Sequence, residues 1–132
     1  MTILTAAFKL DATYVHLEDG PGAIPVEVTD DFWQTLDERT ELHDGRLITL
    51  GHMGSDWDHW EMHPAGDELV YLLSGAMELI LDVPGGEQVI ALGERQAIIV
   101  PRGVWHRARI HRAGDALFVT RGAGTQHRPV LA

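Results

Sequence analysis

Short segments of strand-forming residues, each closed by glycine or proline, follow one another through most of this chain. In the clearest segment, Met77, Leu79 and Leu81 alternate with residues that include Glu78 and Asp82, the pattern of a strand with one buried face. Strands are predicted over residues 46–51, 69–73, 77–83, 88–92, 96–100, 104–110 and 115–120. Many short strands at close spacing indicate an all-β sandwich or barrel.

The two ends of the chain differ from this central region. Turn signals crowd the first thirty residues, which predicts an irregular arm with one or two short strands. Thr29 or Asp30 is expected to cap the one short helix, over residues 31–36. The last ten residues are too polar for a core, so they fold over a barrel mouth, cover a neighbouring subunit or stay loose. The chain therefore divides into an N-terminal arm, a barrel and a C-terminal tail, at residues 1–40, 41–122 and 123–132.

Composition removes several classes of function. Hydrophobic residues make up 45% of the 132 residues, enough for one core, and the absence of cysteine excludes disulfides, thiolate metal ligands and cysteine nucleophiles. A formal net charge of −10 disfavours nucleic acid as a partner, because an acidic chain repels phosphate backbones. No apolar run is long enough to span a bilayer and no signal-peptide pattern is present, so we expect a cytoplasmic protein with no membrane partner.

A group of arginines interrupts this acidic composition. Arg102, Arg107, Arg109 and Arg112 lie within one short segment. Such a run is usually a solvated strand face, and the alternative is a local site for an anion.

Histidine and glutamate alternate in one segment before the first central turn. If the segment is extended, His59, Glu61 and His63 leave the same face of the strand. Side chains two residues apart on a strand can hold one ion, because their Cβ atoms point the same way. The next strand begins at Glu68 after a turn, so Glu68 could return beside His63.

A second candidate lies forty residues later. In the segment 104–110, Val104, His106, Ala108 and Ile110 share the small or apolar face, which should point inward. His106 is therefore the one polar residue that the alternation places inside. A buried imidazole needs partners for its nitrogen atoms, and a metal ion or a carboxylate would serve. The plainer interpretation is a core histidine that is satisfied by ordinary hydrogen bonds.

Together these residues resemble the two motifs of the cupins. The first motif has the spacing of Glu61-x-His63, four residues, Glu68, six residues and Gly75, with Gly54 near the expected upstream glycine. The second motif corresponds to Gly93, Pro101-Arg102-Gly103, His106 and, in the position of an asparagine, Ile110. The resemblance covers residues 54–110 and implies a double-stranded β-helix, the jelly-roll-like cupin barrel.

The resemblance also implies one divalent metal ion. Carried over by position, the ligands are His63, Glu68 and His106, while Glu61 replaces the usual first histidine. Glutamate is an acceptable ligand for Fe, Mn, Ni, Co or Zn, so Glu61 is taken as the fourth ligand. His59 could instead rotate in as an alternative ligand. Without metal, Glu61 would pair with an arginine or histidine, and Glu68 would only close the turn.

Three functions follow from these alternatives. The first is a metal-binding cupin that binds or acts on a small oxygen-bearing organic molecule, by dioxygenase, isomerase or cyclase chemistry, with Glu61 as a general base if it is not a ligand. The second is a metal-free module that binds a small molecule. The third is a metal-free acid–base enzyme that uses His63 with Glu68 or His106 with Glu61. A homodimer is expected in each case, because the barrel leaves sheet edges to cover.

The remaining aromatic and histidine residues carry weaker expectations. Trp57 has the parity of Glu61 and could line the pocket mouth, whereas Trp60 is assigned to the core. Trp105 is assigned to the core or to a subunit contact. Three histidines are expected at the surface: His16, His43 and His111.

Overall fold

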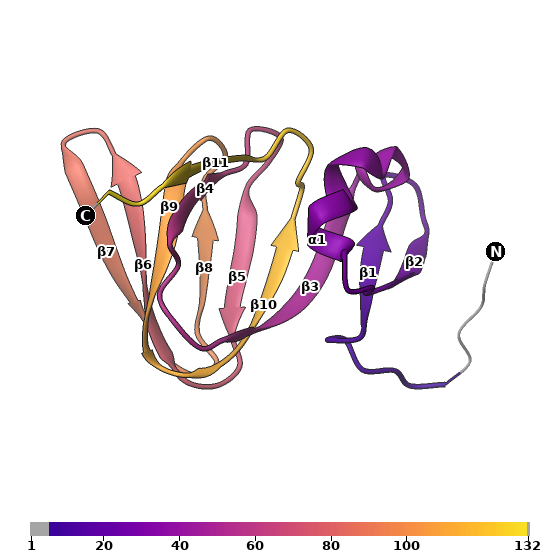
Figure 1. Ribbon diagram of the computed structural model, residues 1–132, viewed down its shortest axis with the longest axis horizontal. Helices are drawn as coiled ribbons and strands as arrows, with labels where there is room; N and C mark the ends of the chain where they lie inside the picture. Colours follow the sequence, from indigo (N-terminus) through magenta and orange to yellow (C-terminus); the bar gives the residue numbers. More distant parts are fainter. Residues whose placement is uncertain (1–5, 132) are drawn as a thin grey trace.

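A computed structural model describes residues 6–131 and shows two antiparallel sheets whose inner faces enclose one core (Figure 1). The all-β jelly-roll prediction is confirmed. Each of the seven predicted strands is present, with ends that differ from the prediction by no more than two residues. The first five residues of the expected arm and the last residue of the expected tail lie outside the described residues. Within those limits, no helix is both long and apolar enough to cross a membrane.

In the described part of the chain, eleven strands make up the two sheets. In order across the six-stranded sheet they are β2 (Ala23–Glu27), β1 (Thr13–Leu17), β3 (Arg46–Met53), β10 (Gly114–Thr120), β5 (Glu68–Leu72) and β8 (Ala97–Val100). In order across the five-stranded sheet they are β11 (Gln126–Pro129), β4 (His59–Met62), β9 (Trp105–Arg112), β6 (Ala76–Val83) and β7 (Gly86–Leu92).

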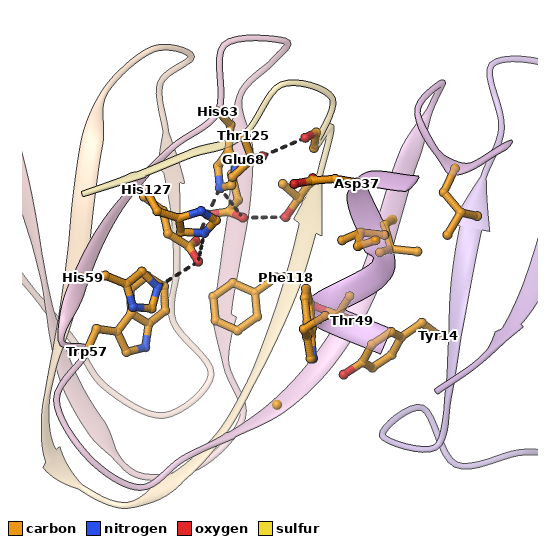
Figure 2. Close-up of a pocket in the computed structure, with 18 of the residues that line it drawn as sticks. Tyr14, Asp37, Thr49, Trp57, His59, His63, Glu68, Phe118, Thr125 and His127 are labelled. Carbon is orange, nitrogen blue, oxygen red and sulfur yellow. Dashed lines mark hydrogen bonds and ion pairs between the residues drawn. The ribbon is translucent and has the colours of Figure 1, made fainter. Parts of the chain in front are cut away.

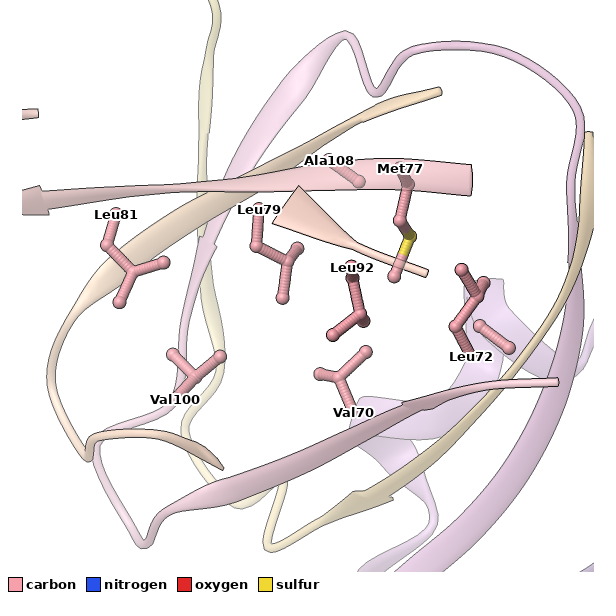
Figure 3. Packing of buried hydrophobic residues seen from close by; sticks show 9 residues of the cluster. Val70, Leu72, Met77, Leu79, Leu81, Leu92, Val100 and Ala108 are labelled. Atoms are coloured by element: carbon pink, nitrogen blue, oxygen red, sulfur yellow. The ribbon is translucent and has the colours of Figure 1, made fainter. Parts of the chain in front are cut away.

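Aliphatic side chains from both sheets pack against one another inside the barrel (Figure 3). Leu79 of β6 and Val70 of β5 are completely buried, and Leu72 and Val100 are almost so. Burying each of these side chains contributes about 1.5–3 kcal/mol. This packing holds the two sheets together.

The N-terminal arm contains the expected short strands. β1 and β2 form a hairpin that extends the six-stranded sheet beyond β3 (Figure 1). Tyr14, Val26, Phe32 and Leu47 form a second, smaller core that fixes the arm to β3.

The helix differs from its prediction. It is a single turn, α1 (Phe32–Thr35), followed by two unpredicted 3-10 turns, η1 (Leu36–Glu38) and η2 (Thr40–Leu42). Neither Thr29 nor Asp30 caps it, because Asp31 occupies the N-cap position without a side-chain cap bond. The Thr29 hydroxyl donates instead to the Asp31 carboxylate.

The surface prediction for His16 is wrong. His16 shares the inward face of β1 with Tyr14 and is only 3% exposed. Its Nε2 lies 2.7 Å from the carbonyl oxygen of Asp44. The residue is covered because β1 is an interior strand between β2 and β3. The surface prediction for His111 is confirmed, since it is exposed beside Glu78, whereas His43 is half-buried.

The arginine-rich strand β9 has the character of a solvated face. Arg109 faces Glu78, and Arg112 donates to Glu94. Arg107 lies over the ring of Trp60, which is buried beneath arginines on the outer face of the five-stranded sheet rather than in the barrel core. Each of these three arginines therefore has a carboxylate or aromatic neighbour.

Candidate metal centre

One row of side chains crosses three neighbouring strands of the five-stranded sheet. β4 lies between β11 and β9, and the strand register places Glu61 opposite both His127 and His106. Residues opposite one another in antiparallel strands point to the same face. His59 and His63 flank Glu61 two residues away on either side, so four histidines surround one carboxylate.

The buried part of this arrangement is an inner group around Glu68 (Figure 2). The Nε2 atom of His63 lies 3.2 Å from Oε2 of Glu68, and the Nε2 atom of His106 lies 3.2 Å from its Oε1. Oε2 of Glu61 is 3.8 Å from Nε2 of His63. Exposed fractions are 6% for His63, 3% for Glu68 and 0% for His106. The structure thus brings together the four residues on which the sequence prediction rests.

Hydrogen bonds on the far side of each ring orient the two inner histidines. Nδ1 of His106 lies 3.0 Å from the carbonyl oxygen of Val104, which can only accept. Nδ1 of His63 lies 2.8 Å from the hydroxyl of Thr125, and that hydroxyl already donates to the carbonyl oxygen of Gly122. Both rings therefore carry a proton on Nδ1, so the inward-facing Nε2 is the atom that each ring, when neutral, can offer to a metal ion.

Three of the converging atoms lack a hydrogen bond. They are Nε2 of His63, Nε2 of His106 and Oε1 of Glu68, all of them buried. Polar atoms left unpaired in a protein interior are costly, so such a cluster calls for a ligand. Atoms bound about 2.1 Å from one ion lie about 3.0 Å apart at octahedral angles and about 3.4 Å apart at tetrahedral angles. The two separations of 3.2 Å, one to each oxygen of Glu68, fall in this range, and one ligand atom from each of Glu61, His63 and His106 lies within 4.8 Å of the others, so the group can hold a divalent ion.

The charges of the inner group are strongly coupled. Burial raises the pKa of Glu68, but the adjacent imidazoles of His106 and His63 outweigh burial and lower this pKa to about 2. Burial also lowers the pKa of His106, and the Glu68 carboxylate outweighs that effect and raises it. The Thr120 hydroxyl donates to Oε2 of Glu68. Glu68 is therefore held as a carboxylate, the form that binds a cation.

A second group lies nearer the surface. Oε1 of Glu61 is 3.3 Å from Nε2 of His59 and 3.4 Å from Nε2 of His127. His59 belongs to this outer group and not to the inner one. Glu61 is shared, since its other oxygen faces His63.

Both groups open into one cavity of about 780 Å³. Figure 2 shows Asp37 and Tyr14 of the arm across the cavity from the histidines. Met53, Trp57 and Phe118 supply apolar wall, which agrees with the expectation that Trp57 lines a pocket. The arm thus closes one side of a pocket whose polar end is the histidine and glutamate cluster.

Two residues of the site were not predicted from the sequence. Thr125 and His127 belong to the C-terminal tail, where no hydrophobic alternation marks a strand. β11 nevertheless pairs with β4 along four residues and places Thr125 beside His63 and His127 beside Glu61. One sequence signal could have indicated them: Thr125 and His127 are two residues apart, the spacing at which side chains of an extended segment share one face.

A two-sheet jelly-roll barrel with histidine and glutamate side chains inside it defines the class of this protein. A family model for the cupin domain, Cupin_2, matches residues 46–120. The chain belongs to the cupin family. A comparison with curated protein sequences gives no match.

Solved structures of other cupins share the fold. A cupin-2 domain containing protein from Shewanella frigidimarina NCIMB 400 has a TM-score of 0.50 and 17% identity, over 57% of this chain and 69% of that one. Oxalate oxidase in complex with the substrate analogue glycolate has a TM-score of 0.52 and 11% identity, over 61% and 45%. Hydroxypropylphosphonic acid epoxidase from S. wedmorenis has a TM-score of 0.50 and 15% identity, over 57% and 43%. The match spans less than half of either enzyme chain, and these identities show a common fold.

Proposed function

We propose that this cupin binds a divalent transition-metal ion through His63, Glu68 and His106, with Glu61 as the fourth ligand. The ion would be Fe, Mn, Ni, Co or Zn, and a small oxygen-bearing organic molecule would occupy the cavity beside it. The observation that carries the proposal is the convergence of three buried atoms without hydrogen bonds, two of them imidazole nitrogens whose rings are oriented from behind. Metal binding by a protein of this fold supports the proposal: a solved structure with a TM-score of 0.50 and 15% identity is that of an enzyme named HppE with cobalt(II) and substrate.

The chemistry at the site would divide between the ion and the protein. A bound divalent ion supplies a Lewis acid that polarises an oxygen atom of the ligand. His63 and His106 hold their Nε2 atoms toward it, and Thr125 and Val104 keep the rings in that orientation. Glu61 is less buried than Glu68 and faces the cavity, so its carboxylate can also accept a proton from a bound molecule.

The cavity wall favours an uncharged ligand with an apolar body. Among the described residues, neither a lysine nor an arginine lines the cavity, whereas Asp37, Glu61 and Glu68 do. A small dianion would find no cationic side chain there to neutralise it. Apolar wall from Trp57 and Phe118 would instead cover a hydrocarbon or aromatic part while an oxygen atom reaches the metal.

Metal content tests the proposal directly. Untagged protein, purified without a nickel column and then stripped with chelator, is loaded with each of the five ions, desalted and analysed for bound metal and melting temperature. We expect retention of at least one ion per chain and a higher melting temperature, because an ion that binds only the folded state stabilises it. His106→Ala should lose the ion held by the inner group, and so retain less metal than the wild type, while the barrel remains folded.

His111→Ala is the matched control. His111 lies on the same strand as His106 but is exposed and faces only Glu78 and solvent-side residues. It should retain metal like the wild type. Absence of retained metal from the wild-type protein, together with an unchanged melting temperature for all five ions, would refute the proposal. Full activity in excess chelator, once a substrate is known, would favour the metal-free acid–base alternative.

The homodimer expected from the sequence stays a prediction. Sedimentation equilibrium of the metal-loaded protein would check it, and a single species at 14.6 kDa would exclude a stable dimer.

A further inference from the structure

Glu61 stands at the centre of a cross of histidines. Along β4 its neighbours on the same face are His59 and His63, and across the sheet they are His127 and His106. The two oxygens of its carboxylate point different ways. Oε2 faces the inner group, at 3.8 Å from Nε2 of His63, whereas Oε1 faces the outer group, at 3.3 and 3.4 Å from its two histidines.

We propose that His59, His127 and Oε1 of Glu61 form a second metal site, and that the Glu61 carboxylate bridges it to the inner site. The second site would bind a divalent transition-metal ion that imidazole and carboxylate groups coordinate, such as Mn, Co or Zn. The bridging part of this inference rests on the proposed function of the inner site. The outer pair of histidines does not depend on it.

The outer group has the spacing that one ion requires. Its candidate ligand atoms all lie within 4.8 Å of one another. The nitrogen–oxygen separations of 3.3 and 3.4 Å agree with the spacing of about 3.4 Å between ligand atoms on a tetrahedral ion. Two protein histidines and one carboxylate oxygen leave a coordination position for water or a ligand. Such an open site faces the cavity, where all three residues are part of the wall.

A carboxylate behind His59 supports metal binding independently. Nδ1 of His59 lies 2.9 Å from Oδ1 of Asp58, which can only accept a hydrogen bond when ionised. With its Nδ1 proton directed at Asp58, the ring presents Nε2 to Oε1 of Glu61, 3.3 Å away, and an ion would take the place of that hydrogen bond, as in the carboxylate–histidine–metal arrangement of many metal sites. Trp57 stacks on the His59 ring, with centroids 5.7 Å apart and planes 7° apart, and holds its plane.

The bridge accounts for a glutamate where cupins usually have a histidine. An imidazole at position 61 has one free nitrogen toward the metal, whereas a carboxylate has two oxygens and can bind two ions at once. His127, which the tail supplies opposite Glu61, completes the second site. Glu61 in the place of a histidine and His127 from strand β11 would therefore serve the same second metal site.

Stoichiometry tests the inference. Metal-free, untagged wild-type protein is titrated with Mn²⁺ by calorimetry, and the same samples are examined by electron paramagnetic resonance. We expect two equivalents of Mn²⁺ and exchange coupling between them, because one carboxylate joins the two ions. His127→Ala should bind one equivalent and give the spectrum of isolated Mn²⁺, with its inner site intact. His111→Ala, which removes an exposed histidine beside a single glutamate, should behave like the wild type.

The outcomes separate the two proposals. One equivalent in the wild type, unchanged by His127→Ala, would overturn the second site and leave the proposed function standing. No binding to the wild type would overturn both. One equivalent that disappears in His127→Ala but survives in His106→Ala would establish the outer site and overturn the inner one. Two equivalents without exchange coupling would establish both sites and overturn the bridge.

Discussion

Thr125→Val should weaken metal binding although Thr125 touches no proposed ion. Valine has nearly the shape of threonine but lacks the hydroxyl that accepts the Nδ1 proton of His63 across 2.8 Å. In the metal-free variant the proton can move to Nε2 and be donated to Glu68, 3.2 Å away. Metal binding then has to return the proton to Nδ1, which is left buried without an acceptor.

The expected size of the effect follows from that unpaired group. A buried N–H without a partner costs about 1–3 kcal/mol, and this cost falls on the metal-bound state alone. Since 1.4 kcal/mol corresponds to a factor of ten, the Kd of the inner site should rise about 5- to 150-fold. Loss of an outer hydrogen bond to a metal-binding histidine typically weakens binding about 10- to 100-fold, which agrees with this range.

Competition against a fluorescent chelator at neutral pH measures this Kd. Thr125→Ser is the matched control, because it keeps the hydroxyl and removes only a methyl group. We expect serine to bind within a few-fold of the wild type and valine to bind much more weakly, with similar melting temperatures for the two metal-free variants. A Kd for Thr125→Val within twofold of the wild type would refute the assigned role of this hydrogen bond.

Three further outcomes are expected. The lowered pKa of Glu68 stabilises the metal-free fold above pH 4.5, and this contribution is lost as the pH falls toward 2. The raised pKa of His106 stabilises the metal-free fold below pH 6.5, and this contribution is lost as the pH rises through the pKa of His106 in the folded protein. Metal needs neutral imidazole, so the rise in melting temperature on adding Zn²⁺ should be larger at pH 8 than at pH 6, and an equal rise would contradict this. Leu79→Ala should lower the free energy of unfolding by about 2–5 kcal/mol in urea titrations, because Leu79 is completely buried. Gly114→Ala should destabilise the fold, since its Cβ would lie 2.0 Å from the carbonyl oxygen of Ser74, while Gly54→Ala, with its nearest atom at 3.5 Å, should not.

Local alternation was enough to predict the strands of the barrel and the inward position of His106. Met77, Leu79 and Leu81 face the core because one strand with a period of two must bury one face. The same rule placed His106 inside, where it is completely buried. Motif spacing added Glu68, which follows a turn and has no alternation of its own to place it.

Features that depend on distant pairing could not be predicted in this way. β11 is four residues long and mostly polar, so its position is decided by hydrogen bonds to β4 and by the contact of Arg128 with Trp60 and Trp105. His16 was misplaced for the same reason: its burial comes from the strands on either side of β1 and not from its own segment. The helix cap was assigned too early because several capping residues adjoin one another at positions 29–31.

The location of β11 at the edge of its sheet has a kinetic consequence. β11 is hydrogen-bonded to β4 alone, yet His127 and the partner of His63 come from this strand and the turn before it. Edge strands open locally at lower free energy than the strands of a core. Opening of β11 would release one ligand of the outer site and the support of one ligand of the inner site together. The residence time of metal would therefore follow the fluctuations of this strand, and slower amide hydrogen exchange in β11 on metal loading would report the coupling.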